Sequence, residues 1–274
     1  MLVARKHLGS TVIGLLLLAL MLFPVYWVLV SSLEPQQDNF HAPPFLVPPA
    51  PTLAPYGRAL AIMGPYIANS AIIAVGTVVL ALLLGAPAAY AMAHLRLRVA
   101  TVLMVLLLLM TQMFPDIMLA TPLFVLFNRL GLVNTYPGLI LADATGAVPF
   151  VTLVLRAYLI GVPHELTEAA LVDGAGLFGA FWRVILPVAV PGIITAALFV
   201  FMGAWGDFTF GLTLTTNTSV QPVALGLYNF IGLHTTAWND LMAGAVLTAL
   251  PTTALLIVAQ RYISGGLTLG ALKG

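Results

Sequence analysis

Residues 11–30 read TVIGLLLLALMLFPVYWVLV, a run without one charged side chain. A helix needs roughly 20 predominantly apolar residues to cross the hydrocarbon core of a bilayer. Arg5 and Lys6 precede the run, but it is longer than the apolar region of a secretory signal, and no small-residue cleavage pattern follows it. The stretch therefore predicts a membrane-spanning helix that the protein retains.

The composition of the whole chain also indicates a membrane protein. Its 274 residues are 61% hydrophobic and 7% charged, whereas a soluble globular domain carries about 25% charged residues. A net charge of +1 gives no reason to expect a nucleic-acid partner. The chain has no cysteine, and its five histidines are scattered without ligand spacing, so we expect neither disulfides nor a metal site.

Further stretches are long and apolar enough to span, so the predicted fold is an all-α integral membrane protein. The six predicted spans are about 11–32, 68–93, 99–127, 137–160, 188–212 and 242–263. We interpret residues 1–274 as a single transmembrane domain with these six helices.

The cations predict the orientation, because Lys and Arg concentrate in cytoplasmic loops. The cations assigned to the cytoplasmic side are Arg5, Lys6, Arg96, Arg98, Arg261 and Lys273, against Arg58 and Arg129 on the other side. This distribution predicts a multi-pass protein of a bacterial or archaeal plasma membrane with both termini in the cytoplasm. The connection 161–187 then also faces the cytoplasm.

Two outward connections are long. Residues 34–66 are rich in proline, which predicts an extended loop rather than a span. Residues 213–241 mix polar and aromatic side chains, which suits contact with a soluble protein. A loop that only packs over the outer end of the helices is the alternative for this second connection.

The connection 161–187 contains EAALVDGAGLFGAFWRVILP at residues 168–187. Gly174 and Gly176 predict a break between two short helices. The helical spacing of the apolar residues in the second helix predicts one apolar face: Leu177, Phe178, Phe181, Trp182 and Ile185. That face could lie in lipid headgroups, but interfacial helices usually carry cations. This segment is net acidic, so we favour a protein groove as its partner.

Residues 168–187 resemble the EAA signature of the permease subunits of binding-protein-dependent ABC importers. Glu168-Ala169-Ala170, Gly174 and Leu186-Pro187 stand in register with it, and Val184 replaces an Ile. The tail at 260–274, QRYISGGLTLGALKG, resembles the ending of the maltose/trehalose-type (MalG-like) carbohydrate permeases, and Met113-Phe114-Pro115 agrees with that subfamily. The resemblance covers all six predicted spans.

This resemblance implies one permease subunit of an ATP-driven importer for a sugar or sugar-like solute, of the disaccharide, oligosaccharide or glycerol-phosphate type. Its implied partners are a second permease subunit, a dimer of ATP-binding subunits, an extracytoplasmic substrate-binding protein and membrane lipid. ATP and Mg would bind to the partner ATPase, and this chain would be no enzyme. The residues implied to couple the chain to the ATPase are Glu168, Ala169, Ala170, Asp173, Gly174, Leu177, Phe178, Phe181, Trp182, Leu186 and Pro187.

The motifs that are absent from the sequence agree with a transport subunit. The only lysines are Lys6 and Lys273, and no GxxxxGK[ST] phosphate loop occurs. No serine-hydrolase or HExxH motif occurs either, which argues against a membrane enzyme. The remaining alternative is an ion-coupled secondary transporter that acts without an ATPase, which would be expected to show inverted repeats and carboxylates at mid-membrane.

Ionisable residues within membrane spans are the default functional candidates. The candidates for a substrate path are Asp116, Asp143, Trp205 and Asp207. The alternative interpretation is a capped helix break or a hydrogen bond between helices. Related permeases often have Asn where this chain has Gly206, which removes an amide from the candidate path.

Overall fold

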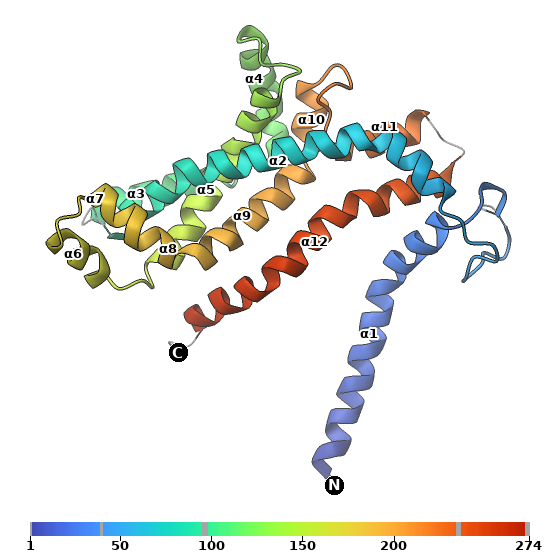
Figure 1. Cartoon of the computed structure of the whole chain (residues 1–274), viewed down its shortest axis with the longest axis horizontal. Coiled ribbons are helices and arrows are strands. Elements are labelled where there is room, and N and C mark those ends of the chain that lie inside the picture. Colours follow the sequence, from blue (N-terminus) through green and yellow to red (C-terminus); the bar gives the residue numbers. More distant parts are fainter. Residues whose placement is uncertain (1, 39–40, 95–97, 234–236, 272–274) are drawn as a thin grey trace. The chain divides into compact units, whose positions relative to one another are not determined.

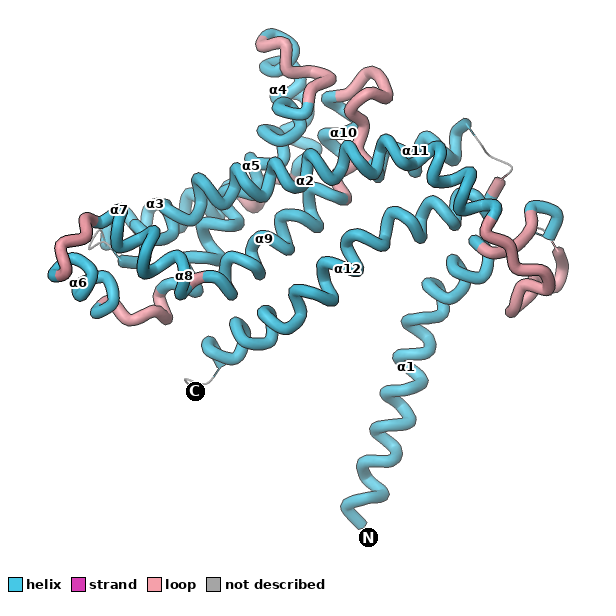
Figure 2. The backbone as a smooth tube through the Cα atoms, in the orientation of Figure 1, coloured by secondary structure: helices cyan, strands magenta, loops and turns pink. Residues whose placement is uncertain are grey.

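The structure of the protein, a computed structural model, describes residues 2–38, 41–94, 98–233 and 237–271. All regular elements over these residues are helical, as Figures 1 and 2 show, so the predicted all-α class is confirmed. The contacts divide the chain into two compact units. The first contains residues 1–64 and 227–250, and the second contains residues 65–226 and 251–274.

In the first unit, polar contacts join the end of α1 (Leu2–Ser32) to the start of α2 (Ala54–His94), and the start of α2 to the start of α12 (Trp238–Ala271). The short 3₁₀ helix η1 (Gln36–Asp38) follows α1. The hydroxyls of Ser32 and Tyr56 lie 2.7 Å apart. Arg58 donates two hydrogen bonds to Asp240, of 2.9 Å from Nε and 2.7 Å from Nη2. This paired geometry suits a guanidinium facing a carboxylate and joins the start of α2 to the start of α12.

The second unit contains the rest of α2 together with most of the shorter helices. These are α3 (Arg98–Thr111), α4 (Asp116–Arg129), α5 (Tyr136–Leu159), α9 (Val190–Trp205) and α10 (Thr209–Leu214), with the short helices of the 161–187 connection between α5 and α9. Helix α11 (Val223–Leu233) starts in this unit and ends in the first.

Helices α2 and α5 approach each other closely because α2 presents small residues. A side chain at Gly76 would collide with Ile140 of α5, and one at Gly85 would come within 2.8 Å of Val151. Small residues commonly permit such close contact between membrane helices. One core of this unit contains Tyr90 and three buried alanines of α2, Val151, Leu155 and Leu159 of α5, and Phe181.

Two of the predicted spans are not single straight helices. The third stretch, 99–127, consists of α3 and α4, which meet at 92°. Pro115 lies at this break in an extended conformation, with ψ 140°, and proline cannot continue the preceding helix. The fifth stretch, 188–212, contains α9, then a break at Gly206, then α10.

Four helices over the described residues are long and apolar enough to span a membrane, or up to six if each bent pair counts as one span. The bent pairs are α3 with α4, and residues 177–188 with α9, the latter at 79°. The upper count equals the predicted number of six spans, although the second bent pair begins at residue 177 and ends at 205, whereas the predicted fifth span is 188–212.

The loop predicted at 34–66 is shorter than expected, because α2 already begins at Ala54. Pro55 is its second residue, where proline is tolerated, and Pro65 lies inside the helix. Neighbouring helices can satisfy the backbone groups that such a proline leaves unpaired. Arg96, His234 and Lys273 lie outside the described residues.

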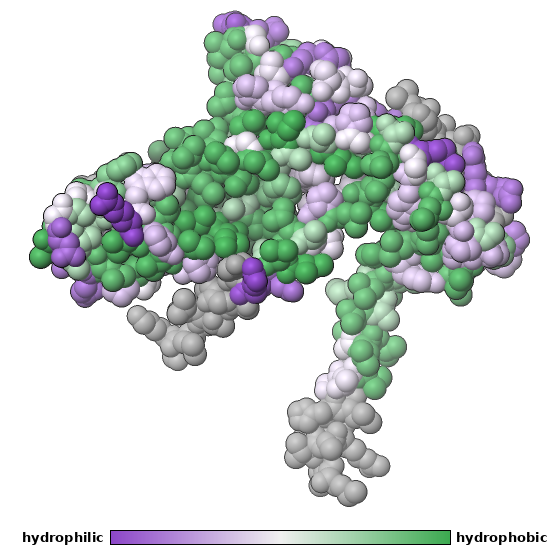
Figure 3. All heavy atoms as spheres, viewed as in Figure 1, coloured by the Kyte–Doolittle hydropathy of each residue, from purple (hydrophilic) through white to green (hydrophobic). Residues whose placement is uncertain are grey.

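The surface of the second unit matches a membrane environment. Figure 3 shows apolar side chains over the middle of the unit, and hydrophilic ones gathered near α6 at one end and near α4 and α10 at the other. Exposed apolar residues are dense on α3 and continue across the break into α4. A contiguous apolar surface of this kind is expected to contact lipid or another membrane subunit.

Candidate functional site

The connection 161–187 forms two short helical parts joined by glycine, as the sequence predicts. Helix α6 (Glu165–Val172) is followed by α7 (Leu177–Ala180), one turn of π-helix η2 (Phe181–Ile185) and α8 (Leu186–Val188). We call residues 164–187 the coupling segment.

Gly174 ends α6 in a left-handed conformation, with φ +84°. Its amide donates to the carbonyl of Leu171 at 3.1 Å, and the amide of Ala175 donates to that of Ala170 at 2.9 Å. This pair of bonds is the Schellman motif, which satisfies the last carbonyls of a helix and favours glycine at the left-handed position. The coupling segment therefore turns at Gly174 for a local backbone reason.

The apolar residues of the second part do not form the single exposed face that the spacing predicts. Phe181 is 4% exposed and Ile185 is fully buried, because both pack into the core of the second unit. Phe178 is 75% exposed, and Leu177 and Trp182 are also exposed. The helix thus divides its apolar residues between the core of this chain and an outward surface.

The outward surface also contains Leu171 and Val172 at the end of α6. We call Leu171, Val172, Leu177, Phe178 and Trp182 the outer patch. The other predicted coupling residues are placed as follows: Glu168, Ala169, Asp173, Gly174 and Pro187 are exposed, Ala170 is buried and Leu186 is half-buried.

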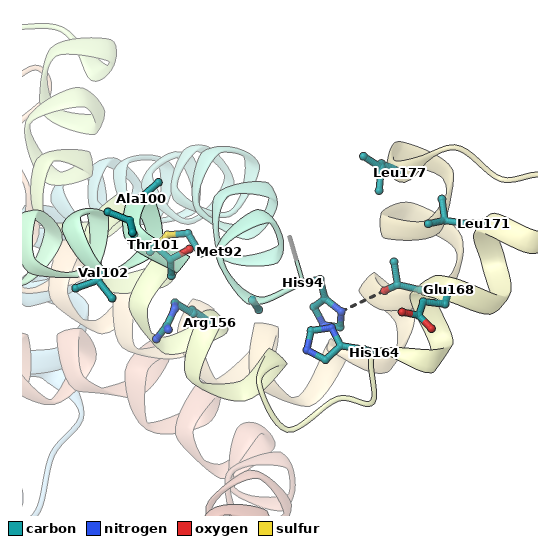
Figure 4. Close-up of a pocket in the computed structure, with 13 residues that line it drawn as sticks. Met92, His94, Ala100, Thr101, Val102, Arg156, His164, Glu168, Leu171 and Leu177 are labelled. Carbon is teal, nitrogen blue, oxygen red and sulfur yellow. Dashed lines mark hydrogen bonds between the residues drawn. The ribbon is translucent and has the colours of Figure 1, made fainter. Parts of the chain in front are cut away.

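A groove of about 1350 Å³ lies beside the coupling segment. Figure 4 shows His164, Glu168, Leu171 and Leu177 on one side of it, and Met92, Ala100 to Val102 and Arg156 on the other. His94 at the end of α2 contacts the coupling segment. Sequence reasoning missed His94, since it is one of five scattered histidines.

The three candidate carboxylates of the membrane region, Asp116, Asp143 and Asp207, all belong to the second unit. Asp143 of α5 interacts electrostatically with both Asp207 and Asp116. Asp116 is exposed in the first turn of α4, and Asp143 is half-buried. No group of three His, Cys, Asp or Glu residues over the described parts of the chain is arranged to hold a metal ion.

Asp207 caps α10. Its carboxylate accepts hydrogen bonds from the amides of Phe210 at 3.3 Å and Gly211 at 3.0 Å. A side-chain oxygen at this position satisfies amides that have no partner within the helix. Trp205, the fourth candidate, is buried and stacks on Phe201 with ring centroids 5.6 Å apart. The structure thus gives both residues a structural role.

The connection between α10 and α11 is held by asparagines from two other elements. Asn134, with φ +60°, accepts from the amide of Thr216 at 2.7 Å and donates to its hydroxyl at 2.8 Å. Asn69 of α2 donates to the carbonyls of Ser219 and Gln221. The residues between these anchors remain exposed, so this connection presents a fixed polar tip.

Comparison with known proteins gives a consistent result over almost the whole chain. The family described as the inner membrane component of binding-protein-dependent transport systems matches residues 81–268. A trehalose transport system permease protein of Mycobacterium tuberculosis is 36% identical, over 99% of this chain and 99% of the relative. A trehalose/maltose transport system permease protein of Thermococcus litoralis is 34% identical, over 96% of both chains.

A third relative, a sulfoquinovosyl glycerol transport system permease protein of Agrobacterium fabrum, is 31% identical over 92% of this chain and 89% of its own length. Among solved structures, a bacterial ABC transporter that imports the acidic polysaccharide alginate matches with a TM-score of 0.81 and 22% identity. The match covers 94% of this chain and 96% of the other. At 22% identity this match shows a shared fold and nothing about function.

Proposed function

Because the chain belongs to the family of inner membrane components of binding-protein-dependent transport systems, we propose that it is one permease subunit of an ATP-driven importer for a sugar or sugar-like solute. The names of several relatives state a sugar or sugar-like cargo: trehalose, maltose, diacetylchitobiose or a sulfoquinovosyl glycerol. Family membership favours this function over an ion-coupled transporter that acts without an ATPase.

The observation that carries the coupling role is the outer patch on the coupling segment. Its apolar side chains are exposed at one of the two hydrophilic ends of the second unit, where lipid tails would not cover them. An exposed apolar patch of this kind is typical of a protein–protein interface. In this proposal the patch docks in a groove of a cytoplasmic ATPase subunit, and the acidic Glu168 and Asp173 flank the contact.

Energy coupling then follows from the rigidity of the helices. ATP and Mg bound by the ATPase dimer drive its closure, the closure moves the coupling segment, and the helices that it contacts move with it. The spans thereby alternate between inward-open and outward-open states. The loaded binding protein favours the outward-open state by contacting the outer connections, among them the fixed tip at 216–219.

The complete assembly would contain this chain, a second permease subunit, two ATP-binding subunits and an extracytoplasmic binding protein, with both termini of this chain in the cytoplasm. Asp116, Asp143, Trp205 and Asp207 stay candidates for a substrate path. Electrostatic interaction among the three carboxylates supports a polar region at that level of the unit.

The test is purification of the complex through a tag on this chain in mild detergent, followed by measurement of ATP hydrolysis. An ATPase subunit should be recovered, and its activity in lipid should rise when the binding protein is added with trehalose or maltose. Recovery of this chain without an ATPase would contradict the proposal. Hydrolysis that only a non-sugar solute stimulates would contradict the sugar assignment alone.

A further inference from the structure

The inner end of α2 contacts both halves of the coupling segment. Helix α2 ends at His94, and Tyr90 lies four residues before it on the same face. His94 contacts residues of α6 and of the turn before it, and Tyr90 contacts η2. These residues are separated by more than sixty positions in the sequence, so only the tertiary fold brings them together.

The contact with α6 is a buried polar one. Nδ1 of His94 lies 3.2 Å from the hydroxyl of Thr167, with His94 9% exposed and Thr167 7% exposed. The ring of His94 also packs against that of His164, with centroids 4.6 Å apart; Figure 4 shows the two rings side by side and the hydrogen bond beyond them. A hydrogen bond between buried side chains holds its partners in one orientation.

The contact with the second half is aromatic. Tyr90 lies one helical turn before His94, and the two rings stack with centroids 5.3 Å apart. Tyr90 also packs against Phe181 at 5.3 Å. Phe181 is buried in the core of the second unit, so the two rings and Thr167 join α6 and η2 to the same end of α2.

Beside the contacts of His94 and Tyr90, the coupling segment does not pack against α3. The groove of about 1350 Å³ separates Glu168, Leu171 and Leu177 from the start of α3. A displacement of α6 toward α3 therefore meets open space, whereas a displacement relative to α2 meets the contacts of His94. A displacement of the coupling segment is therefore transmitted to α2 directly. It is transmitted to α3 only after the groove has closed.

We propose that His94, through its hydrogen bond to Thr167, is the positioning residue that makes α2 move together with the coupling segment. The inference rests on the proposed function, because it presupposes an ATPase that moves the segment. Residues 65–94 of α2 form one continuous helix within the second unit. A displacement at His94 is therefore carried to the part of α2 that packs on α5.

The experiment uses the absence of native cysteine. Glu165→Cys on α6 and Leu84→Cys on α2, both at exposed positions, take spin labels in the complex with its ATPase in nanodiscs. The distance between the labels is measured without nucleotide and with ATP and vanadate. In the otherwise native chain, nucleotide should leave this distance unchanged, because α6 and α2 move as one body.

The test variants are His94→Phe, which keeps an aromatic ring, and Thr167→Val, which keeps the shape of threonine. Nucleotide should separate the labels in both variants, while the nucleotide-free distance stays native. The ratio of complexes in which α2 moves with α6 to those in which it does not should fall about fivefold, the factor that corresponds to one hydrogen bond of about 1 kcal/mol. The matched control is Thr152→Val, since this buried hydroxyl bonds only to Val148 of its own helix, at 2.8 Å.

Two results would overturn the inference alone: a nucleotide-dependent distance already in the native chain, or an unchanged distance in both variants. An altered nucleotide-free distance in either variant would also overturn it, because the residue would then only hold the fold. If no ATPase is recovered with the native chain, the proposed function falls and this inference falls with it.

Discussion

Gly174 shows how one residue determines the shape of the coupling segment. Its φ of +84° lies in the left-handed region, while Gly176, two residues later, has an ordinary φ of −71°. A Cβ added at either glycine would meet no atom within 4 Å. The two positions therefore differ in backbone conformation and not in the space around them.

We expect Gly174→Ala to strain the turn by about 1–2 kcal/mol, the cost of a left-handed conformation for a residue with a Cβ. The strain should weaken binding of the ATPase to the complex by about tenfold. Gly176→Ala is the matched control and should bind normally. Titration of the purified ATPase against both variants measures the difference, and equal affinities would contradict the role given to Gly174.

Two substitutions of Asp207 can distinguish its role as a helix cap from a role in the substrate path. Asp207→Ala should lower the free energy of unfolding by about 0.5–2 kcal/mol, the usual cost of a lost cap. Asp207→Asn should largely restore it, because the amide oxygen can accept the same hydrogen bonds. Thermal unfolding in detergent and solute uptake are measured together. If uptake falls equally in both variants, the carboxylate charge itself matters and capping is not its whole role.

At the scale of elements, the adjacent helices α7 and η2 each contain a phenylalanine, and the two differ in burial. Phe178 of α7 is exposed, whereas Phe181 of η2 is buried. Phe181→Ala removes a core side chain and should lower the free energy of unfolding by about 3–5 kcal/mol. Phe178→Ala removes an exposed one, so the free energy of unfolding should stay within about 0.5 kcal/mol. Thermal unfolding of the isolated chain compares the two.

The Phe178→Ala variant also tests the outer patch. Phe178→Ala should reduce the amount of ATPase that is recovered with the chain, because it removes apolar area from the proposed docking surface. Glu165→Ala, at an exposed position in the first turn of α6 and outside the outer patch, serves as the control and should leave recovery unchanged. Normal recovery with Phe178→Ala would exclude this side chain from the contact.

At the scale of the whole molecule, the proposed orientation can be read with single cysteines, since the native chain has none. Thr218→Cys in the outer tip and Glu165→Cys on α6 both replace exposed residues. A membrane-impermeant maleimide applied to spheroplasts should label only the Thr218→Cys variant. Inverted vesicles should give the reverse pattern, and any other result would contradict cytoplasmic termini.

Much of the architecture could be predicted because its causes are local. A long apolar run such as residues 11–30 needs a membrane whatever surrounds it. Gly174 breaks a helix through its own backbone freedom. Pro115 was visible in the sequence, yet the 92° angle between α3 and α4 was not, because proline marks where a helix ends and its neighbours decide where the chain goes next.

The sequence by itself determined an all-α membrane protein, the place of the coupling segment and the turn within it, since hydropathy and backbone preference belong to single residues and their near neighbours. Only the tertiary structure decided which aromatic residues of that segment face outward. It also decided that Thr167 meets His94 and that Asp207 caps α10. Those outcomes depend on packing between residues far apart in the chain, and no spacing in the sequence encodes that packing.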